Sequence, residues 1–216
     1  MKSTIILFLL VLTFPLSDLL AQTDTNFVLL ENGDKVYGNY QFFRPSDRPA
    51  FFMFGDSLKI PLSKVNAYQF NNDYFARYRE GMVSKFLYRT ITGKIDLFEE
   101  NLYIPGRNVV NKYTYEYFSK DNGNIMEANY ENLSKALADN MESLGHLKKY
   151  NTLGYVQWGM VGAGAVIIVT GLATSGEGKS NMGMLIGGAV VAALSYIPYL
   201  IREPELRNAI NSYNNK

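Results

Sequence analysis

The chain contains no cysteine and only one histidine among its 216 residues. The missing cysteines exclude disulfide scaffolds, thiolate metal sites and cysteine nucleophiles, and a single histidine excludes the usual multi-histidine metal site. Charge of one sign is also lacking, because 21 Lys and Arg residues balance 20 Asp and Glu residues. A nucleic-acid-binding surface is therefore not expected. Because cysteine is absent and histidine nearly so, we also expect no metal, no cofactor and no catalytic residue.

The N-terminus has the organisation of an export signal. A short basic start at Met1 and Lys2 precedes the apolar run Ile5–Leu12, and Ala21 stands before a polar stretch. This order is typical of a secretory signal peptide, which we expect to be removed after Ala21. The alternative is an uncleaved signal anchor, which the short apolar run makes less favourable.

Two further apolar segments lie in the second half of the chain. Residues Val156–Ala173 and Met182–Ile201 carry no charge, and the polar loop Thr174–Asn181 joins them. At 1.5 Å per residue, about 18 to 20 helical residues match a hydrocarbon core of roughly 30 Å. The sequence therefore predicts a transmembrane helical hairpin over residues 151–203.

Aromatic residues mark one end of this hairpin. Tyr155 and Trp158 open the first span, and Tyr196 and Tyr199 close the second. In a hairpin these two ends meet the same face of the membrane, where Trp and Tyr prefer to lie. We expect these four residues to act as interfacial anchors.

Small residues recur at four-residue spacing in both spans, which lets helix backbones approach closely in lipid. The pairs are Gly159 with Ala163, Gly183 with Gly187, and Gly188 with Ala192. We favour packing of one hairpin helix on the other. Homo-oligomerisation through the same glycine-rich hairpin is the alternative.

The expected orientation contains a conflict. An export signal places residues 22–150 on the periplasmic side of a cell membrane, with the hairpin loop in the cytoplasm. However, the ends of the spans away from this loop are flanked by Lys148, Lys149, Arg202 and Arg207. The positive-inside rule alone therefore favours an orientation with these ends in the cytoplasm. We give the signal priority because it acts first.

Residues 22–128 consist of short aromatic-rich segments between turn signals. Asn32-Gly33 is a strong hairpin signal, and Lys112–Phe118 alternates Tyr with Thr and Glu, as a half-buried strand does. The expected strands are 27–31, 35–43, 50–54, 58–62, 65–70, 86–92, 95–98, 112–118 and 125–128. Their spacing predicts an antiparallel β-rich meander or small barrel.

A helical period begins near residue 131, and Asn129 is placed to cap it. Its apolar positions are Leu133, Ala136, Leu137 and Met141. We expect a juxtamembrane helix within residues 129–150. A short amphipathic tail, residues 204–216, has Pro204 in its first turn and lies on the membrane surface or docks on the β domain. The fold class is thus an α+β membrane protein, in which the β domain precedes a short helix and a two-helix transmembrane hairpin.

Three local patterns that suggest chemistry are better explained without it. Ala173–Ser180 matches a relaxed phosphate-binding loop, but no Asp follows Asp139 and the segment after the loop is another apolar span, whereas such a site needs an acidic residue on a later strand. His146 has no adjacent nucleophile or carboxylate motif. Glu99 and Glu100 point to opposite faces of a strand.

The chain resembles a loose group of uncharacterised secreted or envelope proteins of Bacteroidetes-type bacteria. The resemblance rests on Ala21-Gln22, Leu30–Asp34 with Gly38, Phe86-Leu87 with Gly93–Phe98, and Asn208–Ile210 with Tyr213-Asn214. It covers a minority of the chain. It implies a bacterial envelope setting and no activity.

We therefore expect a non-enzymatic membrane-anchored envelope protein whose exported β domain binds or braces an envelope partner. The alternative is a ligand-binding domain for sugar or peptide, or an enzymatic one, that uses the aromatics of residues 37–130. A concave aromatic pocket would favour ligand binding, and a filled core with an exposed strand edge would favour a protein partner.

Overall fold

The computed structural model describes residues 26–105, 110–175 and 181–216. The chain divides into two compact units, residues 1–88 and 89–216. The predicted signal peptide and the core of the phosphate-loop match, residues 176–180, lie outside the described residues.

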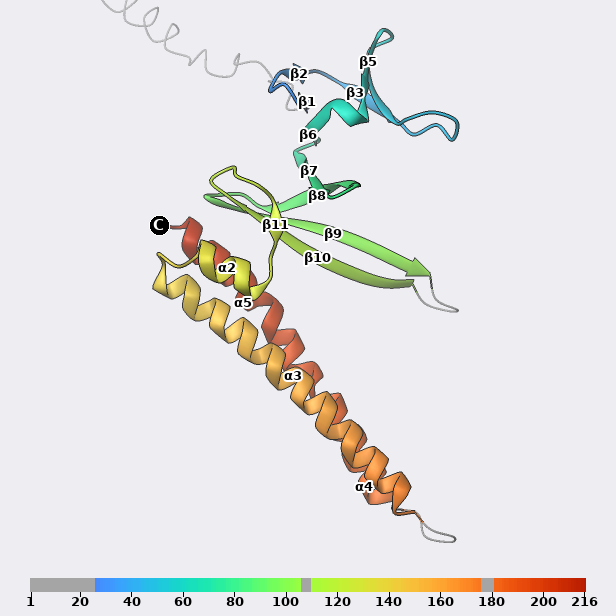
Figure 1. The fold of residues 1–216 in the computed structure, drawn as a ribbon, viewed down its shortest axis with the longest axis vertical. Coiled ribbons are helices and arrows are strands. Elements are labelled where there is room, and N and C mark those ends of the chain that lie inside the picture. The colour runs from blue at the N-terminus through green and yellow to red at the C-terminus, as the bar shows by residue number, and fades with distance from the viewer. Residues whose placement is uncertain (1–25, 106–109, 176–180) are drawn as a thin grey trace, which may run out of the picture. The chain divides into compact units, whose positions relative to one another are not determined.

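The first unit is a curled antiparallel half-barrel built from two sheets, and Figure 1 draws its strands in blue to green. Its larger sheet has the order β2-β1-β6-β7-β8, and its smaller sheet has the order β3-β4-β5. The strands are β1 Phe27–Leu30, β2 Lys35–Tyr37, β3 Tyr40–Phe43, β4 Phe51–Phe54, β5 Leu58–Pro61, β6 Val65–Phe70, β7 Asp73–Glu80 and β8 Val83–Ile91, with a short 3₁₀ turn at Leu62–Lys64. The last three residues of β8 belong to the second unit.

Local turn chemistry explains several of these hairpins. Gly33 has a φ of 90° between β1 and β2, which agrees with the predicted hairpin at Asn32-Gly33 and with the pairing of Leu29 with Lys35. Asn71 and Asn72 both have positive φ between β6 and β7, and Asn is the non-glycine residue best suited to this region. Alternating side chains then bury one face of each strand. The core comprises Val28, Tyr40, Phe52, Phe54, Ile60 and Val65.

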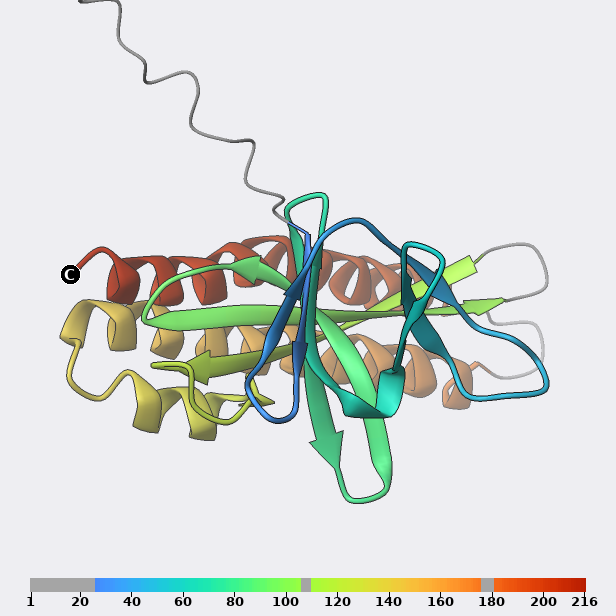
Figure 2. The ribbon, with the colours of Figure 1, turned by 90° about the horizontal axis from the view of Figure 1, so that it is seen from above.

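The second unit combines a long β hairpin with helices. Its strands are the end of β8, β9 Ile95–Pro105, β10 Val110–Lys120 and β11 Met126–Glu127; its helices are α2 Tyr130–Ala136, α3 Met141–Ala173, α4 Met182–Leu194 and α5 Tyr196–Asn214. Figures 1 and 2 show α3 and α5 side by side, with α2 beside the start of α3.

The core of the second unit is completed by α5. Leu206, Ala209, Ile210 and Tyr213 are buried against residues from β9, β10, α2 and α3. Asn214 fixes α5 to β9, because its side chain accepts a hydrogen bond from the Ile95 amide at 2.8 Å and donates one to the Ile95 carbonyl at 2.9 Å. The tail therefore docks on strands of its own unit, one of the two positions expected for it.

The long helices are α3 and the α4–α5 pair, and both are long and apolar enough to cross a membrane. A single turn at Ser195 separates α4 from α5. Pro198 explains this break, because it has no N–H for the Leu194 carbonyl and its ring crowds that carbonyl. The hydroxyl of Ser195 at this break donates a hydrogen bond to the Ala192 carbonyl at 2.6 Å.

The expected β-rich region followed by helices is confirmed, as a half-barrel and a meander. Strand β7 was not expected, and 35–43 is two strands because Gly38, with a φ of 129°, interrupts it. The expectation that Met141 continues the first helix was wrong: Asn140 caps a new helix there by accepting from the Ser143 amide. Pro204 is also not in a first turn but inside α5.

Candidate functional site

Within the second unit, the four predicted anchors gather at one level of the helical pair. Gly154 of α3 lies beside Arg202 of α5, so the residues just below them, Trp158 and Tyr199, belong to the same level of the two antiparallel helices. All four anchors are exposed, Trp158 at 69%. The rings of Tyr196 and Tyr199 stack with centroids 5.6 Å apart. We call Tyr155, Trp158, Tyr196 and Tyr199 the aromatic belt.

Helices α3 and α4 approach each other closely between the aromatic belt and the C-terminal end of α3. A Cβ placed on Gly188 would lie 2.7 Å from the Gly164 carbonyl oxygen, and a Cβ on Gly171 would lie 2.8 Å from the Cβ of Met184. The Cβ of Ala192 likewise lies 2.9 Å from a Cβ built on Gly164. These distances are shorter than ordinary contacts, so only glycine fits at the crossing points.

The six small residues predicted to pack therefore have different surroundings. Gly188 and Ala192 lie in the contact between α3 and α4, whereas Ala163 is exposed and nothing lies within 4 Å of a Cβ on Gly159, Gly183 or Gly187. The sequence reasoning missed Gly164 and Gly171. Their seven-residue spacing places them on one face of α3, and this spacing was the available signal.

A charged layer lies next to the aromatic belt. Glu99 of β9 and Glu116 of β10 are cross-strand partners, and Arg207 of α5 donates a hydrogen bond to Glu99. The guanidinium of Arg202 lies 4.2 Å from the centre of the Tyr150 ring. Burial, reinforced by the Glu203 carboxylate, raises the pKa of Glu116 to about 7.

This layer differs from the carboxylate pair considered in the sequence. Glu100, the neighbour of Glu99, accepts a hydrogen bond from the Tyr117 hydroxyl at 3.5 Å. The two acids that do converge, Glu99 and Glu116, are brought together by strand register. No local pattern in the sequence signals them.

His146 takes part in a structural ion pair. Its Nδ1 lies 2.7 Å from Glu205, and Lys149 donates to the other oxygen of this carboxylate at 2.5 Å. Hydrogen bonds from Lys149 and His146 hold the pKa of Glu205 below its usual value. These three residues link α3 to α5, and we interpret their interaction as structural rather than catalytic.

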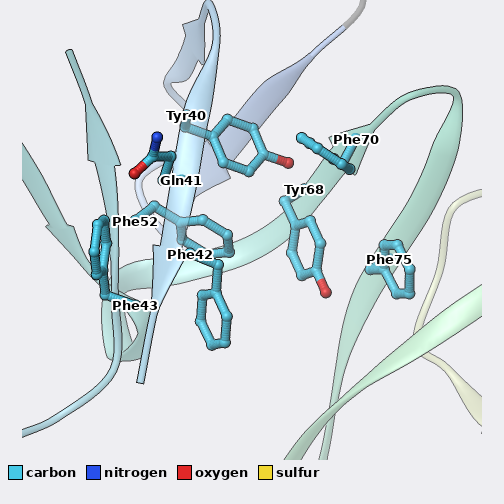
Figure 3. Close-up of a pocket in the computed structure, with 8 residues that line it drawn as sticks. All are labelled: Tyr40, Gln41, Phe42, Phe43, Phe52, Tyr68, Phe70 and Phe75. Atoms are coloured by element: carbon cyan, nitrogen blue, oxygen red, sulfur yellow. The ribbon is translucent and has the colours of Figure 1, made fainter. Parts of the chain in front are cut away.

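The first unit contains an aromatic hollow of about 520 Å³ (Figure 3). Residues from β3, β4, β6 and β7 line it: Tyr40, Gln41, Phe42, Phe43, Phe52, Tyr68, Phe70 and Phe75. We call it the aromatic hollow. Figure 3 shows the rings of Phe42 and Tyr68 on opposite sides of the space, with Phe75 beyond Tyr68.

Ring packing and one hydrogen bond hold the walls in place. Tyr40 donates to the Gln69 carbonyl at 2.8 Å and ties β3 to the end of β6. Phe52 contacts Tyr68 with centroids 5.0 Å apart, and Tyr68 stacks on Phe75 at 4.7 Å. Burial raises the pKa of both Tyr40 and Tyr68, so both remain neutral hydroxyls at pH 7.

The rim of the aromatic hollow is open to solvent. Phe42 is 51% exposed, and Phe43 and Phe70 are also exposed. Strand β3 is the last strand of the order β3-β4-β5 among the described residues, so its outer edge has backbone groups available for pairing. The hollow therefore offers apolar rings and a strand edge together.

No protein-family model, curated protein or solved structure matches the chain.

The described residues contain no group of three or more His, Asp or Glu side chains placed to hold a metal ion. The paired helices with their aromatic belt in the second unit can engage a partner, and so can the aromatic hollow with the β3 edge in the first.

Proposed function

We propose that the protein is a non-enzymatic, membrane-anchored binding protein. In this proposal α3 and the α4–α5 pair span a membrane, and the half-barrel binds an apolar segment of an envelope partner. The observation that carries the anchoring is the exposed, uncharged surface of the paired helices, bordered at one end by the aromatic belt.

The exposure of the helices supports a lipid environment. In their most apolar 18-residue segments, only 11% of the first helix and 17% of the second is buried. Large apolar side chains that face outward include Val166, Val169, Leu172, Ile186 and Val190. Leaving a side chain of this kind in water costs about 1.5–3 kcal/mol each relative to burial, and a hydrocarbon surrounding removes that cost.

The proposed orientation places residues 22–150 on the periplasmic side of a bacterial cell membrane. It rests on the predicted signal peptide and on the bacterial envelope setting expected from the sequence. Under the positive-inside rule, the charges of Lys148, Lys149, Arg202 and Arg207 favour the opposite orientation.

Anchoring and sidedness can be tested on the full chain in cells. We expect alkaline carbonate to leave the protein in the membrane, and release by carbonate would contradict the anchor. Because the chain has no cysteine, a single Met82→Cys in the fully exposed β7–β8 turn reports sidedness. An impermeant maleimide labels it in intact spheroplasts if the orientation is right, and only after lysis if it is reversed.

The aromatic hollow and the β3 edge support binding of an extended apolar segment. A partner strand can pair with the β3 backbone and place alternate side chains among the rings of Phe42, Tyr68 and Phe75. Sugar binding receives less support, because sugars need many polar contacts. Gln41 and the Tyr68 hydroxyl are the main side-chain polar groups in the lining, since the Tyr40 hydroxyl is already bonded to Gln69.

A small apolar ligand is a second candidate for the aromatic hollow. A volume of about 520 Å³ falls within the usual range of about 300–1,000 Å³ for small-molecule pockets, which are mostly lined by apolar and aromatic side chains.

Photocrosslinking distinguishes the two candidates. A photoreactive phenylalanine analogue replaces Phe42 at the rim, and the same analogue replaces Leu58 as the control. Leu58 is an exposed apolar residue on β5 of the same sheet, outside the lining. A polypeptide adduct at position 42 and not at 58 supports the proposed function. A small-molecule adduct supports the second candidate, and equal adducts at both positions contradict a role for the hollow.

A further inference from the structure

The β9–β10 hairpin of the second unit changes character along its length. At one end Leu97 and Phe118 are paired across the strands and fully buried against the helices. Toward the other end Leu102, Tyr103 and Ile104 of β9 are exposed, Tyr103 at 63%. Tyr113 and Tyr115 of β10 are exposed beside them. We call these five residues the apolar end of the hairpin.

The apolar end lies beside the aromatic belt. One groove is lined by Lys112, Tyr113 and Thr114 of β10 together with Tyr199, Glu203 and Arg207 of α5. Tyr199 belongs to the aromatic belt, so this part of β10 is at the level where the exposed helix surface becomes charge-free. Figure 1 shows β9 and β10 extending past α5 on this side.

Exposed tyrosines occupy both faces of the hairpin at this end, and four of the five residues of its apolar end share one of these faces. Tyr103 pairs with Lys112, and Leu102 pairs with Tyr113. Because neighbouring strand residues point to opposite faces, Tyr103 lies on one face, and Leu102, Ile104 and Tyr113 lie on the other. A protein partner that packs on a sheet covers one face, whereas lipid surrounds both.

The charge of Lys112 fits the same environment. Its side chain is exposed on the face that bears Tyr103. Near a membrane surface a lysine ammonium reaches the lipid phosphates while its methylenes stay among apolar groups. Tyrosines with an apolar ring and a polar hydroxyl prefer the headgroup level as well.

We propose that the apolar end of the β9–β10 hairpin inserts into the headgroup region of the membrane beside α3 and α5. It is then a second membrane attachment that fixes the sheet against the lipid surface. This inference rests on the proposed membrane anchoring by the helices.

Lipid quenching of a site-specific label tests this attachment. The full chain is reconstituted in vesicles of phosphatidylcholine with a minority of phosphatidylglycerol. Single cysteines carry an environment-sensitive fluorophore at Tyr103→Cys, at Met141→Cys at the start of α3, and at Val166→Cys in the middle of α3. All three native side chains are exposed, so the substitutions leave the core intact.

If the hairpin inserts, emission at position 103 shifts to the blue and is quenched by lipids with a spin label near the headgroup. Position 166 is then quenched most by spin labels deep in the acyl chains, and position 141 by neither. Quenching at 166 without quenching at 103 overturns the inference and leaves the anchor standing. A blue shift at 103 without lipid quenching also overturns it, because protein then covers the hairpin. Absence of quenching at both 103 and 166 overturns the anchor itself.

Discussion

The close approach of α3 and α4 makes a testable difference between two neighbouring glycines, Gly187 and Gly188. Both lie inside α4, so alanine gives either position the same gain in helix propensity, about 1 kcal/mol. At Gly187 nothing lies within 4 Å of the new methyl group. Gly187→Ala is therefore expected to stabilise the helical pair by up to about 1 kcal/mol.

At Gly188 the same methyl group meets the other helix. It would lie 2.7 Å from the Gly164 carbonyl oxygen and 2.7 Å from Cγ1 of Ile168, whereas apolar atoms prefer about 3.5–4.0 Å. Relief requires the helices to separate locally by about 1 Å, and a gap of that size loses about a quarter to a half of the attraction between atoms that had been in contact. With an overpacking cost of about 1–3 kcal/mol, Gly188→Ala should be less stable than Gly187→Ala by about that amount.

The free energy of unfolding is measured in detergent micelles by titration with sodium dodecyl sulfate, followed by circular dichroism. Gly164→Ala should reproduce the loss, because its methyl group would meet the Gly188 carbonyl oxygen at 2.7 Å. Equal stability of Gly187→Ala and Gly188→Ala would refute the close crossing of α3 and α4.

Two further predictions concern the second unit. Burial raises the pKa of Glu116 from its usual value of 4.5 to about 7. The fold therefore favours the protonated form, and the contribution of this carboxyl to stability is fully present below pH 4.5 and is lost as the pH rises through 7. The free energy of unfolding of the wild type should fall over this range by up to about 3 kcal/mol more than that of Glu116→Gln, and parallel pH profiles for the two proteins would contradict the burial of this carboxyl. Leu206→Ala should cost about 2–5 kcal/mol in the same unfolding assay, because Leu206 is fully buried in the core of the second unit. Leu200→Ala, at an exposed position of the same helix, should cost far less, and equal losses would argue against docking of α5.

Features with a local cause could be predicted from the sequence. The turn at Asn32-Gly33 depends on backbone conformations that these two residues favour, and the side chain of Asn129 caps α2 by accepting from the Asn132 amide. The uncharged segments were recognisable because a membrane-length helix needs only composition and length.

Features that depend on tertiary contacts could not be predicted. Strand β7 was missed because Arg77 and Arg79 interrupt its apolar pattern, yet Arg79 forms an ion pair with Glu31, far away in the sequence. The aromatic hollow draws residues from four strands, and its shape depends on how the two sheets meet. Glu99 pairs with Glu116 through the register of β9 and β10. The expected strand, 95–98, ended one residue before Glu99, so this pair could not be predicted.

The order of synthesis gives the docking of α5 a further consequence. Leu133 of α2 and Tyr213 of α5 belong to one core but are 80 residues apart in the sequence. At about 5–20 residues per second, Tyr213 is made about 4–16 s after Leu133. During that interval α3 and α4 are synthesised, and Leu97 and Phe118 lack the residues of α5 that cover them in the folded unit. The core of the second unit can therefore be completed only after both apolar helices have been synthesised.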